Sequence, residues 1–231
     1  RQILFLLIIT FVVFTTSIIA CIFTSISEDL KYLIGFGVSI LTLVLSLLLK
    51  RKYDIITYSY RHMALFENMG PAVSARDDLF TLSWLSLLES DGYSLFKELG
   101  GFSLYYKIGE GARKGSQYKT LFIYVLIKDE DISFENQMLV KNINLLEDYL
   151  KHDSKYKQRI IYQLKQSDHF TQEKAKETNL VMFINQKSMN LVLINVYHFK
   201  KDNVAFFVHS LNYPPTAYYE FATKELLKLI Q

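Results

Sequence analysis

The sequence of 231 residues has one cysteine and three prolines, and these shortages exclude several classes of protein. Because Cys21 is alone, no intramolecular disulfide can form, and a reducing compartment suits the chain. Three prolines leave no extended proline-rich linker. The chain also has no hydrolase, transferase or redox motif and no set of metal ligands, so we predict a protein that is not an enzyme and uses no cofactor.

Charge is scarce at the start of the chain. Residues 1–50 hold three of the 26 Lys and Arg residues and two of the 23 Asp and Glu residues, which leaves 23 basic and 21 acidic residues beyond them. This nearly neutral remainder argues against broad nucleic-acid binding through a basic face. The nearly neutral charge does not exclude a local basic pocket for a small anion.

Two uncharged runs, Ile3–Ile26 and Tyr32–Leu49, are separated by a short polar link. At about 1.5 Å of rise per residue, the first run can cross a hydrocarbon core of roughly 30 Å, and the second is just long enough to return. We therefore predict a transmembrane helical hairpin over residues 1–52, in contact with the lipid bilayer. A cleaved signal peptide is the alternative, but the first run is longer than such a segment and a second run follows at once.

Basic residues flank the hairpin on one side only. They are Arg1, Lys50, Arg51, Lys52 and Arg61. The link between the runs has one lysine beside two acidic residues. The positive-inside rule therefore places both termini in the cytoplasm and the hairpin in the cytoplasmic (inner) membrane.

Small side chains recur on one face of the first run, at Ser17, Cys21 and Ser25. Such a face lets a neighbouring helix approach closely, so we expect helix–helix contact and a homo-oligomer. The alternative is that hydroxyls such as those of Thr10 and Thr24 line a pore built by several copies.

Beyond the hairpin, residues 53–76 are predicted to form a juxtamembrane helix that ends at Gly70-Pro71, with a hinge over Gly70–Ala75. Residues 77–231 are predicted to form a cytosolic α+β sensor domain with an antiparallel sheet flanked by helices. Apolar periodicity indicates helices at 77–99, 133–166 and 216–230, broken near Asp91-Gly92 and His152-Asp153, and strands at 102–108, 120–127, 180–184, 191–199 and 204–211.

This order of elements, over residues 77–231, is similar to that of the PAS and GAF sensory domains. In those folds a five-stranded antiparallel sheet cradles a small ligand. The resemblance rests on element order, and it implies a ligand-binding sensor domain.

The loop from Gly109 to Ser116, between the first two predicted strands, is the best candidate for a ligand site. Its glycines can turn backbone N–H groups inward as an anion nest, and its basic and hydroxyl side chains suit a phosphate. The predicted contacts are Gly109, Gly111, Arg113, Lys114, Ser116 and Lys119. The spacing is not that of a P-loop and a strand follows, so a plain hairpin loop is the alternative.

Other polar residues have weaker patterns. His198 and His209 are on neighbouring predicted strands but not opposite each other, so we expect structural roles. The run Asp129–Asp131 follows a strand end. It could bind a divalent ion there or form a solvated loop. Asp168-His169 suits a loop or a cap. The basic residues of segment 151–165 could contact a phosphodiester or an anionic lipid, or form a solvated helix face.

In outline, the chain resembles bacterial antiviral effectors with two spans and a nucleotide-sensing domain, including the CRISPR-associated membrane proteins that respond to cyclic oligoadenylate. The likeness rests on size, the hairpin, the C-terminal domain and a composition rich in Ile, Tyr, Asn and Lys. It implies an antiviral membrane effector that senses a small nucleotide-type anion, such as a cyclic oligonucleotide, and perturbs or opens the membrane through oligomerised hairpins. The basic loop residues would then contact phosphates, and Tyr105, Tyr106 or Tyr118 would stack on a base.

A different class of function fits the same pattern. The hairpin would be an anchor only, and the domain a non-enzymatic docking or scaffold module of a larger membrane assembly. An exposed apolar patch would then serve as its interface.

Overall fold

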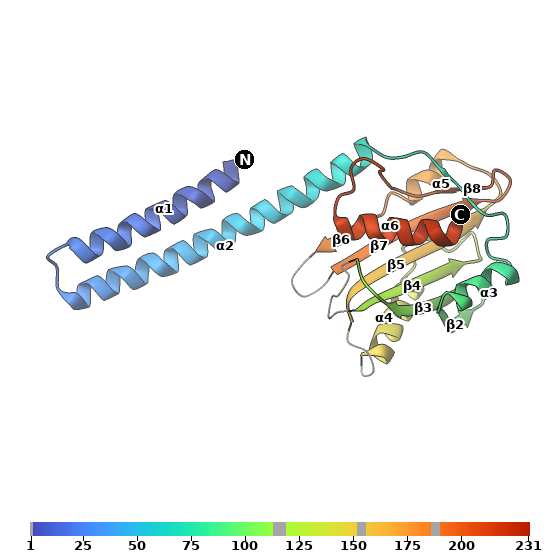
Figure 1. Cartoon of the computed structure of the whole chain (residues 1–231), viewed down its shortest axis with the longest axis horizontal. Coiled ribbons are helices and arrows are strands. Elements are labelled where there is room, and N and C mark those ends of the chain that lie inside the picture. The colour runs from blue at the N-terminus through green and yellow to red at the C-terminus, as the bar shows by residue number, and fades with distance from the viewer. Residues whose placement is uncertain (1, 113–118, 152–155, 186–189) are drawn as a thin grey trace. The chain divides into compact units, whose positions relative to one another are not determined.

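The structure is a computed structural model that describes residues 2–112, 119–151, 156–185 and 190–231 (Figure 1). The chain divides into two compact units, Arg1–Met63 and Ala64–Gln231. The first unit is helical, and the second is built on a mixed β-sheet.

Two long apolar helices occupy the predicted hairpin. They are α1 (Gln2–Phe23) and α2 (Glu28–Glu67), and both are long and apolar enough to cross a membrane. Hydroxyl groups in α1 are bonded within the helix, as shown by the 2.8 Å bond from Thr10 Oγ1 to the Leu6 carbonyl. The 40 residues of α2 correspond to a helix of about 60 Å, roughly twice the length that the hydrocarbon core needs.

The helix continues beyond the second apolar run, as the juxtamembrane pattern predicted. Its last turn belongs to the second unit, where Leu65 is fully buried in the core. The segment Gly70–Ala75, for which the sequence predicted a hinge, is hydrogen-bonded to the sheet. Gly70 N donates to the His209 carbonyl at 2.7 Å, and Val73 and Ser74 pair with a strand near the C-terminus.

An eight-stranded sheet forms the centre of the second unit. Its strands are β1 (Val73–Ser74), β2 (Ser94–Leu99), β3 (Phe102–Gly109), β4 (Lys119–Ile127), β5 (Tyr156–Ser167), β6 (Met182–Asn185), β7 (Asn190–Phe199) and β8 (Val204–Phe206). The order is β1-β8-β7-β5-β4-β3-β2, and β6 also pairs with β7. The prediction of an antiparallel sheet is corrected at the centre, because β4, β5 and β7 run parallel to one another.

Helices cover both faces of this sheet. The first face carries α3 (Leu82–Ser90) and α6 (Ala217–Ile230), and the second carries α4 (Gln137–Leu150) and α5 (Gln172–Glu177). Successive residues of β4 alternate between the two cores, with Phe122 and Tyr124 in the first and Leu121 and Ile123 in the second. A strand that is covered on both faces needs an unbroken apolar sequence, and β4 has one.

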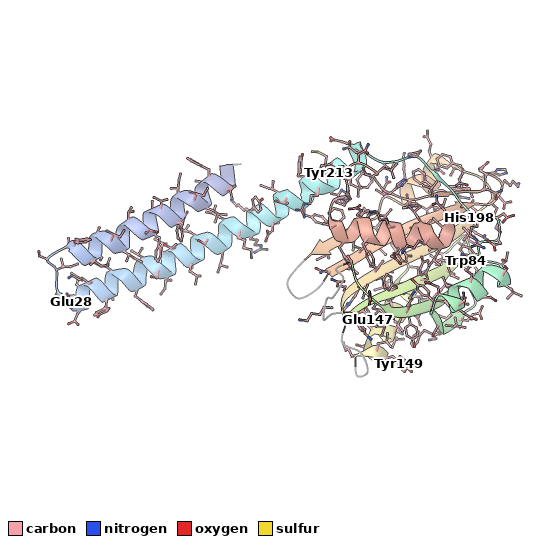
Figure 2. All side chains as sticks on the ribbon, viewed as in Figure 1. Glu28, Trp84, Glu147, Tyr149, His198 and Tyr213 are labelled. Atoms are coloured by element: carbon pink, nitrogen blue, oxygen red, sulfur yellow. The ribbon has the colours of Figure 1, made fainter. Side chains whose placement is uncertain are left out.

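Buried aromatic side chains join the layers on the first face. The Trp84 indole, labelled in Figure 2, is fully buried and donates from Nε1 to the Leu229 carbonyl at 2.8 Å. The Tyr162 hydroxyl donates to the Ala222 carbonyl at 2.7 Å. Each large ring thus fills the core while its polar tip has a partner, which avoids the cost of a buried unpaired donor.

Two segments predicted as helix are strands. Residues 95–99 belong to β2, which pairs with β3, and residues 156–166 belong to β5. In β5 the buried Ile160 and Leu164 are four residues apart, a spacing that also fits one face of a helix, while Ile161 faces the opposite core. Pairing with β4 and β7 decides the outcome. The predictions of strands at 102–108 and 120–127 and of the final helix are confirmed.

The first helix of the second unit begins later than the sequence predicted. Thr81 is its N-cap, and the Thr81 side chain accepts a bond from Trp84 N. Asp78, which was predicted in the first helical turn, instead accepts two bonds from Arg76, at 2.7 and 2.9 Å. This pairing lowers the pKa of Asp78.

Candidate anion-binding site

The carboxyl ends of β4, β5 and β7 meet at one edge of the sheet, since the three strands are parallel neighbours (Figure 1). Loops at the carboxyl ends of parallel strands commonly form ligand sites, because such strands present several loops side by side. A hollow of about 500 Å³ lies at this edge. It is lined by Lys128, Glu130, Gln166, Ser167, Asp168, His169, Thr171, Lys174 and Lys200.

Lys174 is the best-connected cation of this hollow. Its Nζ lies 3.1 Å from Glu130 Oε1 and donates to Ser167 Oγ. Ser167 is the last residue of β5 and is 4% exposed. Thr171 caps α5 by accepting a bond from Lys174 N at 3.2 Å. The Lys174 ammonium is therefore held between a buried hydroxyl and a surface carboxylate.

Glu130 is ionised at neutral pH. Hydrogen bonds from Ser167 and then from Lys174 hold the pKa of Glu130 below its ordinary value, and the charges of Lys174 and Lys165 act in the same direction. The side chain is half exposed, at 53%. It therefore reaches the polar groups of the hollow from the solvent side.

The other lysines of the hollow differ in how they are paired. Lys128 pairs with Glu98. In the described part of the chain, Lys200 has no ion-pair partner. Asp168 lies 3.7 Å from the ammonium of Lys201. Three lysines against two carboxylates thus give the lining of the hollow a positive balance.

A further positive charge lies on the same strand, two residues before Ser167. Lys165 is 3% exposed, and its ammonium lies 3.8 Å from Glu177 Oε2 and 5.5 Å from the centre of the Tyr197 ring. The Tyr197 hydroxyl donates to the same Glu177 oxygen at 2.8 Å. Burial and this bond raise the pKa of Tyr197. Charge interactions are less screened in such an environment, so Lys165 adds to the positive potential felt at Glu130.

The contact between Ser167 and Lys174 is suited to binding rather than to nucleophilic catalysis. A lysine that activates a serine must be neutral to accept its proton. Lys174 Nζ donates to Ser167 Oγ and lies 3.1 Å from Glu130 Oε1, so in this arrangement it acts as a donor toward the serine and not as a base. An ammonium and a hydroxyl arranged this way form a cradle for an oxyanion.

The loop predicted from the sequence lies at the other end of β4. Gly109 pairs with Thr120 at the start of that strand, whereas the hollow follows Ile127. At about 3.3 Å per residue, the two places are on the order of 20 Å apart. Four of the predicted contacts lie outside the described residues: Arg113, Lys114, Ser116 and Tyr118.

The described residues of that loop have other roles. Neither Gly109 nor Gly111 has a positive φ, so the two do not alternate as an anion nest requires. A Cβ at Gly111 would meet the Gln158 amide, so close approach explains this glycine. Lys119 is exposed at the start of β4. Tyr105 is 5% exposed in the core, where its ring has no surface to offer a base.

The acidic run after β4 forms a turn. Asp131 N donates to Asp129 Oδ1 at 3.0 Å, and Glu130 is bound to Lys174. Within the described ranges, no three His, Cys, Asp or Glu side chains are grouped to hold a metal ion. The structure therefore offers no support for a divalent-ion site at this turn.

His198 on β7 and His209, which lies three residues beyond β8, are both buried, in accord with the predicted structural roles. His198 is 1% exposed, and its Nδ1 lies 3.1 Å from Gln166 Nε2 (Figure 2). Burial, and then the charge of Lys200, lower the pKa of His198 to about 4. His209 is 2% exposed, and its ring leaves no space for a side chain at Gly70.

Comparison of the chain with known protein families, curated proteins and solved structures finds no match. The site therefore stands on its geometry. Sequence reasoning missed Ser167, Lys174 and Lys200 as a group because it assigned the segment before Ser167 to a helix. Had 156–167 been read as a strand parallel to 119–127, polar residues after the two strand ends would have indicated a shared edge.

Proposed function

We propose that this chain is a membrane protein with two spans whose globular unit binds a small phosphate-bearing anion of the nucleotide type. The observation that carries the proposal is the convergence of Lys128, Lys174 and Lys200 at the carboxyl ends of three parallel strands. Ammonium groups and hydroxyls are the side-chain donors that phosphate oxygens require. Asp168 and Gln166 suit hydroxyl or amide groups elsewhere on such a ligand.

The membrane part of the proposal rests on the two apolar helices and their flanking charges. Lys50, Arg51 and Lys52 follow the second apolar run, and all three are exposed on α2. The globular unit then lies in the cytoplasm. Thr10 and Thr24 donate to carbonyls of α1, and the small side chains at Ser17, Cys21 and Ser25 are the feature that supports helix packing.

Ligand binding is proposed to act on the packing of hairpins in a homo-oligomer. A ligand can shift such an equilibrium only by its difference in affinity for the two states. The resulting output is a change at the membrane, as in the effectors that the sequence resembles. Binding rather than catalysis is proposed because Lys174 Nζ is a donor to both Glu130 and Ser167.

The ligand test uses the full chain in detergent and follows unfolding through Trp84, the only tryptophan. Pyrophosphate, AMP and a cyclic dinucleotide are the probes, with sodium chloride at matched ionic strength. A bound probe at 100 times its Kd should raise stability by about 2.7 kcal/mol. Lys174→Ala and Lys200→Ala should remove this shift, whereas Lys176→Ala, an exposed lysine of the same helix outside the hollow, should keep it.

The loop predicted from the sequence is tested in the same assay. If Arg113→Ala with Lys114→Ala removes the shift and Lys174→Ala keeps it, the ligand binds at the loop and the hollow is not the site. If none of the probes changes the unfolding of the native chain, ligand sensing is the wrong function.

Topology is tested by labelling intact cells with a membrane-impermeant maleimide. In a Cys21→Ser background, a cysteine placed at Lys31, in the link, should react from outside. A cysteine placed at Lys52 should react only after the cells are opened. If Lys52→Cys reacts in intact cells, the proposed orientation is wrong and the globular unit does not lie in the cytoplasm.

One observation favours the docking function as a second candidate. Three apolar side chains of α4 are spaced on one helical face and exposed: Met138 (57%), Leu145 (45%) and Tyr149 (59%, Figure 2). A scaffold would use this patch to bind another protein. Leu145→Glu would then break assembly in the cell while leaving the phosphate response of the purified chain unchanged.

A further inference from the structure

Glu130 occupies the place in the hollow where an anionic ligand group finds its best donors. Its carboxylate accepts from Lys174 Nζ at 3.1 Å, and the Ser167 hydroxyl, which lies 3.5 Å from the His169 carbonyl, is close enough to lower the pKa of Glu130. A phosphate or carboxylate of a ligand needs these same two donors. The acidic side chain and the ligand therefore compete for one position.

The cradle and its occupant differ in how firmly they are held. Ser167 is 4% exposed, and its carbonyl accepts from Lys200 N at 2.9 Å, which fixes the end of β5 against β7. Lys174 is anchored by the capped turn of α5. Glu130 instead follows β4 in a turn at the surface, with its side chain 53% exposed. The carboxylate can leave for water without disturbing a strand or a helix.

We propose that Glu130 is a built-in competitor for the ligand site, and that the oxyanion group of the ligand replaces it at Ser167 and Lys174. This inference rests on the proposed function and adds the atoms that the anionic group contacts. Only those molecules in which Glu130 has left Ser167 and Lys174 can then bind the ligand. The apparent Kd is therefore higher than the Kd of the open site. An ion pair that is half exposed is weak, so the penalty is small enough for a ligand to overcome.

The test measures pyrophosphate and AMP binding to the full chain in detergent by isothermal titration calorimetry. Glu130→Gln should lower the Kd about fivefold, the size expected for loss of a weak competing ion pair. Two controls remove the same charge without freeing the cradle. Glu135→Gln changes an exposed residue of the same loop outside the hollow, and Glu173→Gln changes an exposed residue of α5 outside the hollow. Each control should change the Kd less than twofold.

The outcomes separate this inference from the proposed function. If the native chain binds a probe and Glu130→Gln binds it no more tightly, or Glu173→Gln tightens binding as much, Glu130 is not the competitor and the anion site stands. If neither the native chain nor Glu130→Gln binds either probe, both ideas are wrong. Combining Lys174→Ala with Glu130→Gln should abolish the gain, because it removes the donor that the freed cradle supplies.

Discussion

Trp84 Nε1 and the carbonyl oxygen of Leu229 are 2.8 Å apart although the two residues are 145 positions apart in the sequence. The bond joins α3 to the last turn of α6 on one face of the sheet. Trp84 is fully buried, so the ring adds packing while its N–H is satisfied. This contact thus ties α3, in the early part of the globular unit, to α6 at its C-terminal end.

The first prediction concerns this contact. Trp84→Phe removes the donor, leaves the Leu229 carbonyl without its partner and opens a small cavity. We expect a loss of about 1–3 kcal/mol from the free energy of unfolding, measured by circular dichroism because the fluorophore is lost. Leu82→Ala, on the same helix but 83% exposed, should change stability by less than about 0.5 kcal/mol. Equal effects of the two changes would contradict the role of the indole bond.

The second prediction concerns the segment that connects α2 to the sheet. A Cβ at Gly70 would lie 2.5 Å from His209 Nε2, in a ring that is itself buried. Gly70→Ala should therefore lower the melting temperature through overpacking, with a cost of about 1–3 kcal/mol. Gly100→Ala is the matched control, since nothing lies within 4 Å of its added Cβ. A melting temperature for Gly70→Ala that equals that of Gly100→Ala would contradict the packing described.

The third prediction is a pH dependence. The pKa of His198 is about 4 in the folded state, against about 6.5 when unfolded. Between these values the unfolded chain binds more protons, so stability falls as pH falls through this window. We expect His198 to account for a loss of about 2 kcal/mol between pH 7 and pH 5, followed by Trp84 fluorescence in urea. In His198→Phe this part of the pH dependence should disappear, and an unchanged profile would count against it.

The fourth prediction concerns an ion pair under α4. Arg159 Nη1 lies 2.7 Å from Glu147 Oε2, whose side chain is 12% exposed. Burial raises the pKa of Glu147 although Arg159 opposes the rise. Arg159→Met should therefore cost about 1–3 kcal/mol at pH 7. Because the folded pKa is raised, the cost should shrink as pH falls and the carboxyl gains its proton.

The control for that pair is Lys151→Met. Lys151 and Asp148 form a pair in which the side chains are 65% and 63% exposed. Exposed pairs contribute little, so this change should cost less than about 0.5 kcal/mol at pH 7. Urea titrations at pH 7 and pH 5 give both numbers. A cost for Arg159→Met that grows toward pH 5 would show that Arg159 does not favour the ionised form of Glu147.

Much of the fold could be predicted because the relevant forces act between neighbours in the chain. The unbroken apolar runs predicted α1 and the start of α2, and the apolar runs at 102–108 and 120–127 predicted β3 and β4. The final helix was predicted from its start near Thr216, which is its N-cap in the structure. In each case a local pattern is strong enough to decide the local structure.

The failures have a common physical cause. Segments 95–99 and 156–166 carry spacings that fit either a helix or a strand, and the partner strand decides between them. Loss of β5 from the prediction also removed the parallel centre of the sheet. The candidate site was consequently sought in the loop at 109–116 instead of at the edge that contains Ser167 and Lys174.

By itself, the sequence determined the two long apolar helices, the nearly neutral globular part and the strands β3 and β4, because hydrophobic runs and caps act over a few residues. Only the tertiary structure decided which charges share a site. Lys128, Lys174 and Lys200 come together because β4, β5 and β7 pair in parallel and bring their carboxyl ends to one edge. Such pairing depends on contacts between segments that are distant in the chain, and no local pattern encodes it.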